Sequence, residues 1–236
     1  MTLRRVRRSA CFGGSTLACL FFLVGCFGPA FPDRMVYNSQ LNHAMIQADT
    51  VYLDVVSVDG QAVPEEALQR AVTRLTAHTI GQFVIRPTVE LRLPESAEGQ
   101  VPRGRIAPPD AEGQLDRVAL VFARNVEGGS RGVFMRMQDD WQQILFSSQR
   151  IQETASVFFL EDQVWEFVIY HELGHALGVP ESAGHRWHAG HCTHPDCVMY
   201  PKIDARSITT FLIRQGPPMD FCRRCAAEIR AARESK

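Results

Sequence analysis

Two histidines and a glutamate with the spacing of a helical metal site stand out in the middle of the chain. His171, Glu172 and His175 form the pattern H-E-x-x-H. Residues four apart lie on the same face of a helix, so both imidazoles could bind one metal ion. Glu172 follows the first histidine, where its carboxylate could accept a proton from water on the metal. Because the same pattern also occurs on structural helices, the residues that follow it decide its meaning.

Further metal-type donors follow this pattern. A hydrolytic zinc site keeps three protein ligands and one open position for water. The two helical histidines therefore need a third partner soon after Gly178, the residue that we expect to end the helix. Residues 181–194 offer five candidates: Glu181, His185, His188, His191 and His194.

Four cysteines lie in the C-terminal quarter of the chain. They are Cys192, Cys197, Cys222 and Cys225, in a C-x4-C pair and a C-x2-C pair. These spacings suit a tetrahedral zinc site with four thiolates, which would hold the last helix against the loop after the metal helix. The alternative is two disulfides, which an oxidising compartment would favour. We prefer zinc, because a bridge between Cys222 and Cys225 would be strained.

The combined spacing resembles one family. His171-Glu172-x-x-His175-x-x-Gly178, followed by Cys192-x4-Cys197-x-Met199 and Cys222-x-x-Cys225, is similar to the archaemetzincins, which are zinc metallopeptidases of the metzincin group. The resemblance covers about residues 170–226. It implies a third zinc ligand after the helix glycine, a methionine turn at Met199 beneath the metal, and a second, structural zinc at the four cysteines. Glu172 would then act as the general base.

The third ligand is the point where the chain departs from this family. Thirteen residues separate Gly178 from Cys192, many more than in the family. In the family pattern a histidine directly precedes the first cysteine, which favours His191. The family's usual ligand position, ten residues after the first histidine, is occupied by Glu181. His185 lies between the two. We rank His191 first, His185 second and Glu181 third.

The N-terminus has the features of a secretory signal. Four arginines at positions 4, 5, 7 and 8 precede the apolar run 17–24, and Leu23-Val24-Gly25-Cys26 resembles a bacterial lipobox. We expect a signal peptide over 1–25, a lipid anchor at Cys26 and a tether over 26–49. The alternative is an ordinary signal peptide or an N-terminal anchor with an incidental cysteine. Phe27 favours the outer membrane slightly, by resemblance to bacterial sorting rules. The protein would then be extracytoplasmic and membrane-attached.

Charge gives no indication of a nucleic-acid partner. The formal net charge of the 236-residue chain is −1. Removal of the first 25 residues takes away four arginines and no acidic residue, so the mature chain would carry −5. A mildly acidic chain lacks the basic surface that nucleic-acid binding needs. We expect a monomer.

The elements that must position these residues form a single α+β domain, which we place at 50–236. β-branched and apolar runs predict strands, and the Pro-Glu-Glu start at residue 64 predicts a helix. The expected elements are strand 51–58, helix 64–79, a strand over 83–93 that Pro87 interrupts, a loop over 94–116, a central strand at 118–122, strands at 132–137 and 141–146, the metal helix from 161 or 162, and a last helix over 220–233. We interpret them as a metzincin-like mixed twisted sheet with an active-site helix and a small Cys-rich C-terminal subdomain. Strand 141–146 is the candidate edge strand that could pair with an extended peptide, and the alternative is an ordinary strand of the sheet.

The sequence therefore predicts a zinc-dependent peptidase that acts on peptides or proteins. The second hypothesis is a non-catalytic, zinc-stabilised envelope lipoprotein that binds a partner. A two-histidine site with no third ligand would favour this second hypothesis, because it would hold metal weakly.

Overall fold

The computed structural model describes residues 41–93, 100–102, 104, 106, 116–136, 142–155, 160–187, 190–201 and 217–235. The predicted signal peptide, Cys26 and most of the predicted tether and loop 94–116 lie outside these ranges, so their assignments stay predictions. Within the described ranges, no helix combines the length and the apolar character that a membrane crossing requires.

A mixed β-sheet forms the centre of the domain. Its strand order is β2-β1-β5-β8-β7, and β3 also pairs with β1. All of these neighbours are parallel except β7, which runs antiparallel to β8. The strands of this sheet are β1 (Thr50–Val58), β2 (Gln82–Ile85), β3 (Val89–Leu91), β5 (Arg117–Ala123), β7 (Gly132–Arg136) and β8 (Gln142–Ser147).

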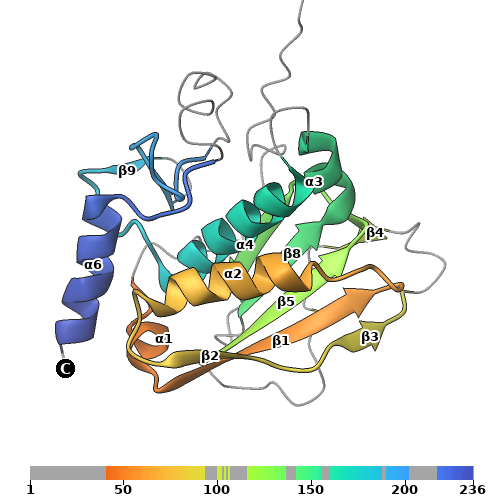
Figure 1. Ribbon diagram of the computed structural model, residues 1–236, viewed down its shortest axis with the longest axis horizontal. Helices are drawn as coiled ribbons and strands as arrows, with labels where there is room; N and C mark the ends of the chain where they lie inside the picture. Colours follow the sequence, from red (N-terminus) through yellow and green to blue (C-terminus); the bar gives the residue numbers. More distant parts are fainter. Residues whose placement is uncertain are drawn as a thin grey trace, which may run out of the picture.

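Helices cover one face of this sheet (Figure 1). α2 and α4 lie side by side across the strands, and their apolar side chains form one core with the facing residues of β1, β5 and β8. At the other face, short segments of 100–106 close a second apolar cluster around β5, where Gln143 binds the backbone of Gly104 and Ile106. The helices are α1 (His43–Gln47), α2 (Glu65–Thr76), α3 (Ser148–Thr154), α4 (Glu161–Leu177) and α6 (Arg223–Glu234).

A buried carboxylate fixes α4 against α2. Glu166 on α4 accepts bonds from Arg70 Nε at 2.6 Å and Arg74 Nε at 2.7 Å, both on α2. Glu166 is buried, and the two guanidinium groups are only half covered. The desolvation of one carboxylate is thus compensated by two partners, as a buried charge requires. The helix that carries H-E-x-x-H therefore has a defined position over the sheet.

The α+β fold with a mixed sheet and an active-site helix is confirmed, and most predicted elements are found within a few residues. β5 is the middle strand and is buried along its whole length, as its apolar run predicted. Pro87 does separate two short segments, β2 and β3, which pair one after the other with β1. Helix α4 starts at Glu161 and ends at Leu177, and it is followed by Gly178, whose φ of 80° is left-handed.

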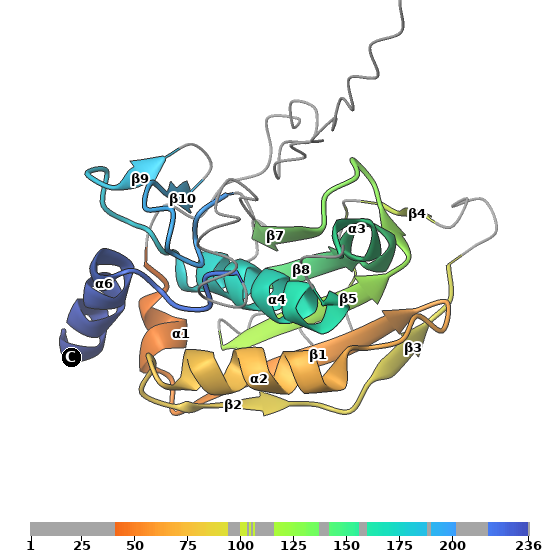
Figure 2. The same cartoon turned by 45° about the horizontal axis from the view of Figure 1, so that its top comes forward.

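Two expectations were wrong. Strand 141–146 is not an edge strand, because β8 lies between β5 and β7, and the edge of the sheet on this side is β7 (Figure 2). The packed domain also begins before residue 50. Helix α1 lies inside the predicted tether, with Met45 and Ile46 fully buried and Asn42 N–H bonded to the carbonyl of Leu177.

The remaining strands are short pairs. β9 and β10 form an antiparallel hairpin that lies together with α6 at the C-terminal end of α4 (Figures 1 and 2). β4 and β6 pair in parallel at the other end of the domain. Their bounds are β4 (Gln100–Val101), β6 (Asn125–Val126), β9 (Arg186–Trp187) and β10 (His191–Cys192).

Candidate active site and metal centre

Three imidazoles meet at the C-terminal half of α4. His171 and His175 project from the helix, and His191 comes from β10. One ring nitrogen of each lies within 4.8 Å of the others. His171 Nε2 and His175 Nε2 are 3.2 Å apart. Two imidazoles on a tetrahedral zinc, each about 2.0–2.1 Å from it, would place their nitrogens roughly 3.4 Å apart, so the pair fits this geometry.

A backbone carbonyl fixes the orientation of His171. Its Nδ1–H donates to the carbonyl oxygen of Val198 at 2.6 Å, which leaves Nε2 to face the other histidines. Such a bond on the far ring nitrogen is usual for histidines that bind metals, because it sets the tautomer and holds the ring. The segment that carries Val198 is itself held by Cys192 N–H, which donates to the carbonyl of Met199 at 2.8 Å.

Burial keeps the two helical imidazoles neutral. It lowers the pKa of His171 to about 3, and the nearby His191 acts in the same direction. The pKa of His175 is also lowered well below its ordinary value, by burial and by its two histidine neighbours. A neutral imidazole has the free lone pair that a metal ligand needs. The cluster is therefore suited to bind a cation rather than to carry positive charge of its own.

Glu172 lies beside this cluster and faces the edge of the sheet. Its Oε2 accepts the N–H of Phe134 on β7 at 2.9 Å, a donor that an edge strand leaves free of the sheet. Burial raises the pKa of the Glu172 carboxyl to about 8, although the bond from Phe134 acts in the opposite direction. A cation on the imidazoles would lower this pKa by attracting the charged form.

Two glycines make room for these side chains. A Cβ on Gly132 would lie 2.7 Å from Glu172 Cγ and 2.8 Å from its Oε1. A Cβ on Gly174, between the two helical histidines, would collide with the sulfur of Met199. Met199 is fully buried and therefore packs directly against the helix at the level of the histidines, as expected of the apolar floor that the methionine turn would form.

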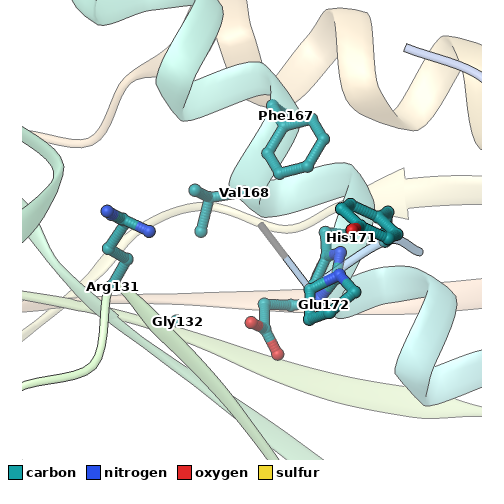
Figure 3. Close-up of a pocket in the computed structure, with 8 residues that line it drawn as sticks. Arg131, Gly132, Phe167, Val168, His171 and Glu172 are labelled. Carbon is teal, nitrogen blue, oxygen red and sulfur yellow. The ribbon is translucent and has the colours of Figure 1, made fainter. Parts of the chain in front are cut away.

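A pocket opens beside the carboxylate (Figure 3). In the figure, Glu172 points toward the strand that carries Gly132, and Phe167, Val168 and His171 line the helix side. Arg131, Tyr200 and Pro201 complete the lining. The pocket borders β7, so the strand next to the metal cluster is β7 and not β8.

A second cluster of potential metal donors includes Cys192 of β10. It consists of His185, Cys192, Cys222 and Cys225, whose ligand atoms all lie within 4.8 Å of one another. Cys197 is close by, with its sulfur 3.7 Å from that of Cys225. All four cysteines are free. Hydrogen bonds from Cys197 and Cys225 lower the pKa of the Cys192 thiol. The same hydrogen bonds raise the pKa of the Cys197 and Cys225 thiols.

The structure thus separates the residues that the sequence left as alternatives. His191 joins His171 and His175, whereas His185 joins the cysteines. Glu181 belongs to neither cluster: its Oε1 accepts the N–H of Leu41 at 3.3 Å. Sequence reasoning missed the roles of Gly132, the Phe134 N–H and the Val198 carbonyl. Backbone donors and acceptors leave no side-chain signal that could have identified them.

Comparisons with known proteins give only distant similarity. No protein-family model and no curated protein sequence matches the chain. Among solved structures, the chain is similar to archaemetzincin from Methanopyrus kandleri, with 19% identity, a TM-score of 0.49, and coverage of 80% of this chain and 98% of that one. It is also similar to archaemetzincin from Archaeoglobus fulgidus in complex with malonate, with 18% identity, a TM-score of 0.46, and coverage of 76% and 99%. Metalloproteinase-II from Bacteroides fragilis has 11% identity, a TM-score of 0.45, and coverage of 85% and 55%.

Proposed function

We propose that the protein is a zinc-dependent peptidase that hydrolyses peptide bonds with Glu172 as general base. The observation that carries this proposal is the position of His191, which adds a third imidazole to the two of H-E-x-x-H. Three protein ligands with one open position are the arrangement of hydrolytic zinc sites. The similarity of the sequence motifs to archaemetzincins agrees with it.

The donor chemistry fits zinc. All three donors are imidazoles, which suit zinc among the available divalent metals. A zinc ion held there would supply a Lewis acid for the peptide carbonyl and would lower the pKa of water. The cluster adjoins the pocket, because His171 belongs to the cluster and also lines the pocket.

Glu172 is placed to move the proton. Its Oε2 is held by the Phe134 N–H, and Oε1 has no hydrogen-bond partner among the described residues. Oε1 would accept a proton from the attacking water and pass it to the leaving amine. Tyr200 lines the same pocket, and its hydroxyl is the candidate to stabilise the developing oxyanion.

The substrate would be a peptide or protein in extended form. Since the sheet edge beside the pocket is β7, this strand replaces residues 141–146 as the candidate for backbone pairing with such a peptide. The alternative of a non-catalytic scaffold depended on a missing third ligand. With His191 beside the helical pair, that reason no longer applies.

Removal and return of metal tests this function. We expect a mild chelator to remove the metal from the three histidines and lower hydrolysis of a fluorogenic casein by more than about 100-fold, because Lewis-acid stabilisation of several kcal/mol is lost. Stoichiometric Zn²⁺ should restore the activity, and metal analysis should follow both steps. Hydrolysis that continues unchanged in the metal-free protein would contradict the proposal.

The close approach of Gly132 to Glu172 gives a second expectation. We expect Gly132→Ala to displace the Glu172 carboxylate and to leave the zinc content unchanged. A catalytic group misplaced by about 1 Å can lower the rate by about 100-fold, so kcat should fall by about that factor. Gly104→Ala is the matched control, because a Cβ at Gly104 meets no atom within 4 Å. Equal kcat values for the two variants would show that Glu172 has more room than the structure indicates.

A further inference from the structure

The second donor cluster lies on the opposite side of β10 from the three histidines. His191 and Cys192 are neighbours in the strand, so their side chains point to opposite faces. His191 enters the first cluster and Cys192 enters the second. Whatever fixes Cys192 therefore also limits the movement of His191.

The second cluster has five potential donors for the four positions of a tetrahedral metal. The cysteine spacing alone predicted a four-thiolate site. The distances in the structure, however, fit a set that includes a histidine: Cys192 Sγ and Cys222 Sγ are 3.7 Å apart, and His185 Nε2 is 3.4 Å from Cys225 Sγ. Zinc with Zn–S of about 2.3 Å and Zn–N of about 2.0–2.1 Å gives ligand separations of roughly 3.8 and 3.6 Å.

His185 is held as a metal-binding histidine usually is. It is buried, and its Nδ1 lies 3.0 Å from Ser182 Oγ and 3.7 Å from a carboxylate oxygen of Glu228 on α6. These contacts occupy the far nitrogen and turn Nε2 toward Cys225. A carboxylate or hydroxyl on the far nitrogen is the common support of a ligand imidazole. Glu228 also accepts the N–H groups of Glu181 and Ser182, so α6 fixes the whole turn that delivers His185.

Cys197 has a different environment. Its sulfur accepts the N–H of Cys222 at 3.2 Å and lies 3.7 Å from the sulfur of Cys225. It does not belong to the set of four donors whose ligand atoms all approach within 4.8 Å. The extra histidine comes from the long segment between Gly178 and Cys192, the part of the motif in which this chain differs most from the family it resembles.

We propose that His185, Cys192, Cys222 and Cys225 bind a structural zinc ion, with Cys197 as a hydrogen-bonded neighbour outside the coordination. This ion ties the turn at 181–185, the hairpin and α6 together. It thereby holds β10, and with it His191, in place. The inference concerns metal binding alone and does not depend on peptidase activity.

Zinc retention in single variants of the full chain tests the donor set. After mild chelation that empties the three-histidine site, we expect the wild type and Cys197→Ser to retain one zinc per chain. His185→Ala should retain none, and Cys225→Ser serves as the reference for a lost ligand. His185→Cys should bind zinc again, which separates loss of a ligand from failure to fold. Zinc lost from Cys197→Ser, or kept by His185→Ala, would overturn the proposal.

Cobalt spectra provide a second readout that does not require a stable ligand variant. Only thiolates produce the near-ultraviolet sulfur-to-cobalt bands, so the three-histidine site does not contribute to them. We expect the same band intensity in Cys197→Ser as in the wild type. A four-thiolate site that included Cys197 would instead lose about a quarter of the intensity on this change, and this result would also overturn the proposal.

Discussion

Replacement of Glu172 by glutamine is expected to abolish peptide hydrolysis and leave both metal clusters filled. The amide has the same shape and can still accept the Phe134 N–H, but it cannot take a proton from water. General bases contribute about 10²–10⁴ to rate, so kcat should fall by at least about 100-fold, with little change in KM. Glu172 belongs to neither group of metal donors, so the zinc content should not change.

The matched control is Glu181→Gln. Glu181 is another carboxylate close in sequence, and it was a candidate third ligand until the structure placed it against the Leu41 N–H. We expect this variant to keep both its zinc and its activity. Measured kcat, zinc content and melting temperature for the two variants decide the matter. A Glu172→Gln protein that retains zinc and most of its turnover would exclude Glu172 as the general base.

The helix of this site was predictable because all of its signals are local. Glu161 begins it, Gly178 ends it, and both histidines fall on one face by simple periodicity. The sequence did not reveal how deeply the helix is buried, since residues on nearly all of its sides are covered. That burial depends on distant elements, chiefly the sheet, α2, and the segment around Met199.

The edge of the sheet could not be predicted from local pattern. Residues 132–137 and 141–146 both resemble strands, and the polar pair Gln142 and Gln143 lies in the second of them. Both glutamines are in fact fully buried. Gln142 bonds Asn42, and Gln143 bonds Gly104 and Ile106, partners distant in sequence that provide the hydrogen bonds a buried amide needs. Strand order depends on such tertiary contacts.

The third ligand was ambiguous for a similar reason. Spacing along the chain could not separate His191, His185 and Glu181, because the long segment after Gly178 can fold in several ways. The alternation of side chains along β10 sends His191 to the helical histidines and Cys192 to the second cluster, and the turn before β9 brings His185 to that second cluster. Helix α1 was missed because a five-residue helix at the start of a domain has too few apolar positions to show a period.

Replacement of His191 by alanine tests the three-histidine cluster in the way that His185→Ala tests the second cluster. We expect an equally large loss of zinc binding. The change removes one of three imidazoles, so zinc affinity at this cluster should fall by more than about 100-fold, beyond the usual loss for a merely supporting residue. Peptide hydrolysis should then be undetectable at ordinary zinc concentrations. The zinc at the cysteines should remain, because Cys192 keeps its place on the other face of β10.

The control for this variant is His194→Ala. His194 follows β10 and is exposed, and its ring accepts the N–H of the nearby Asp196. It should therefore keep both metals and full activity. The two histidines near Cys192 then give opposite patterns: His191→Ala loses the chelatable zinc and keeps the tightly bound one, and His185→Ala loses the tightly bound one. If both variants lost the same metal ion, the two clusters would form one site, and the separation of the catalytic site from the structural site across β10 would be wrong.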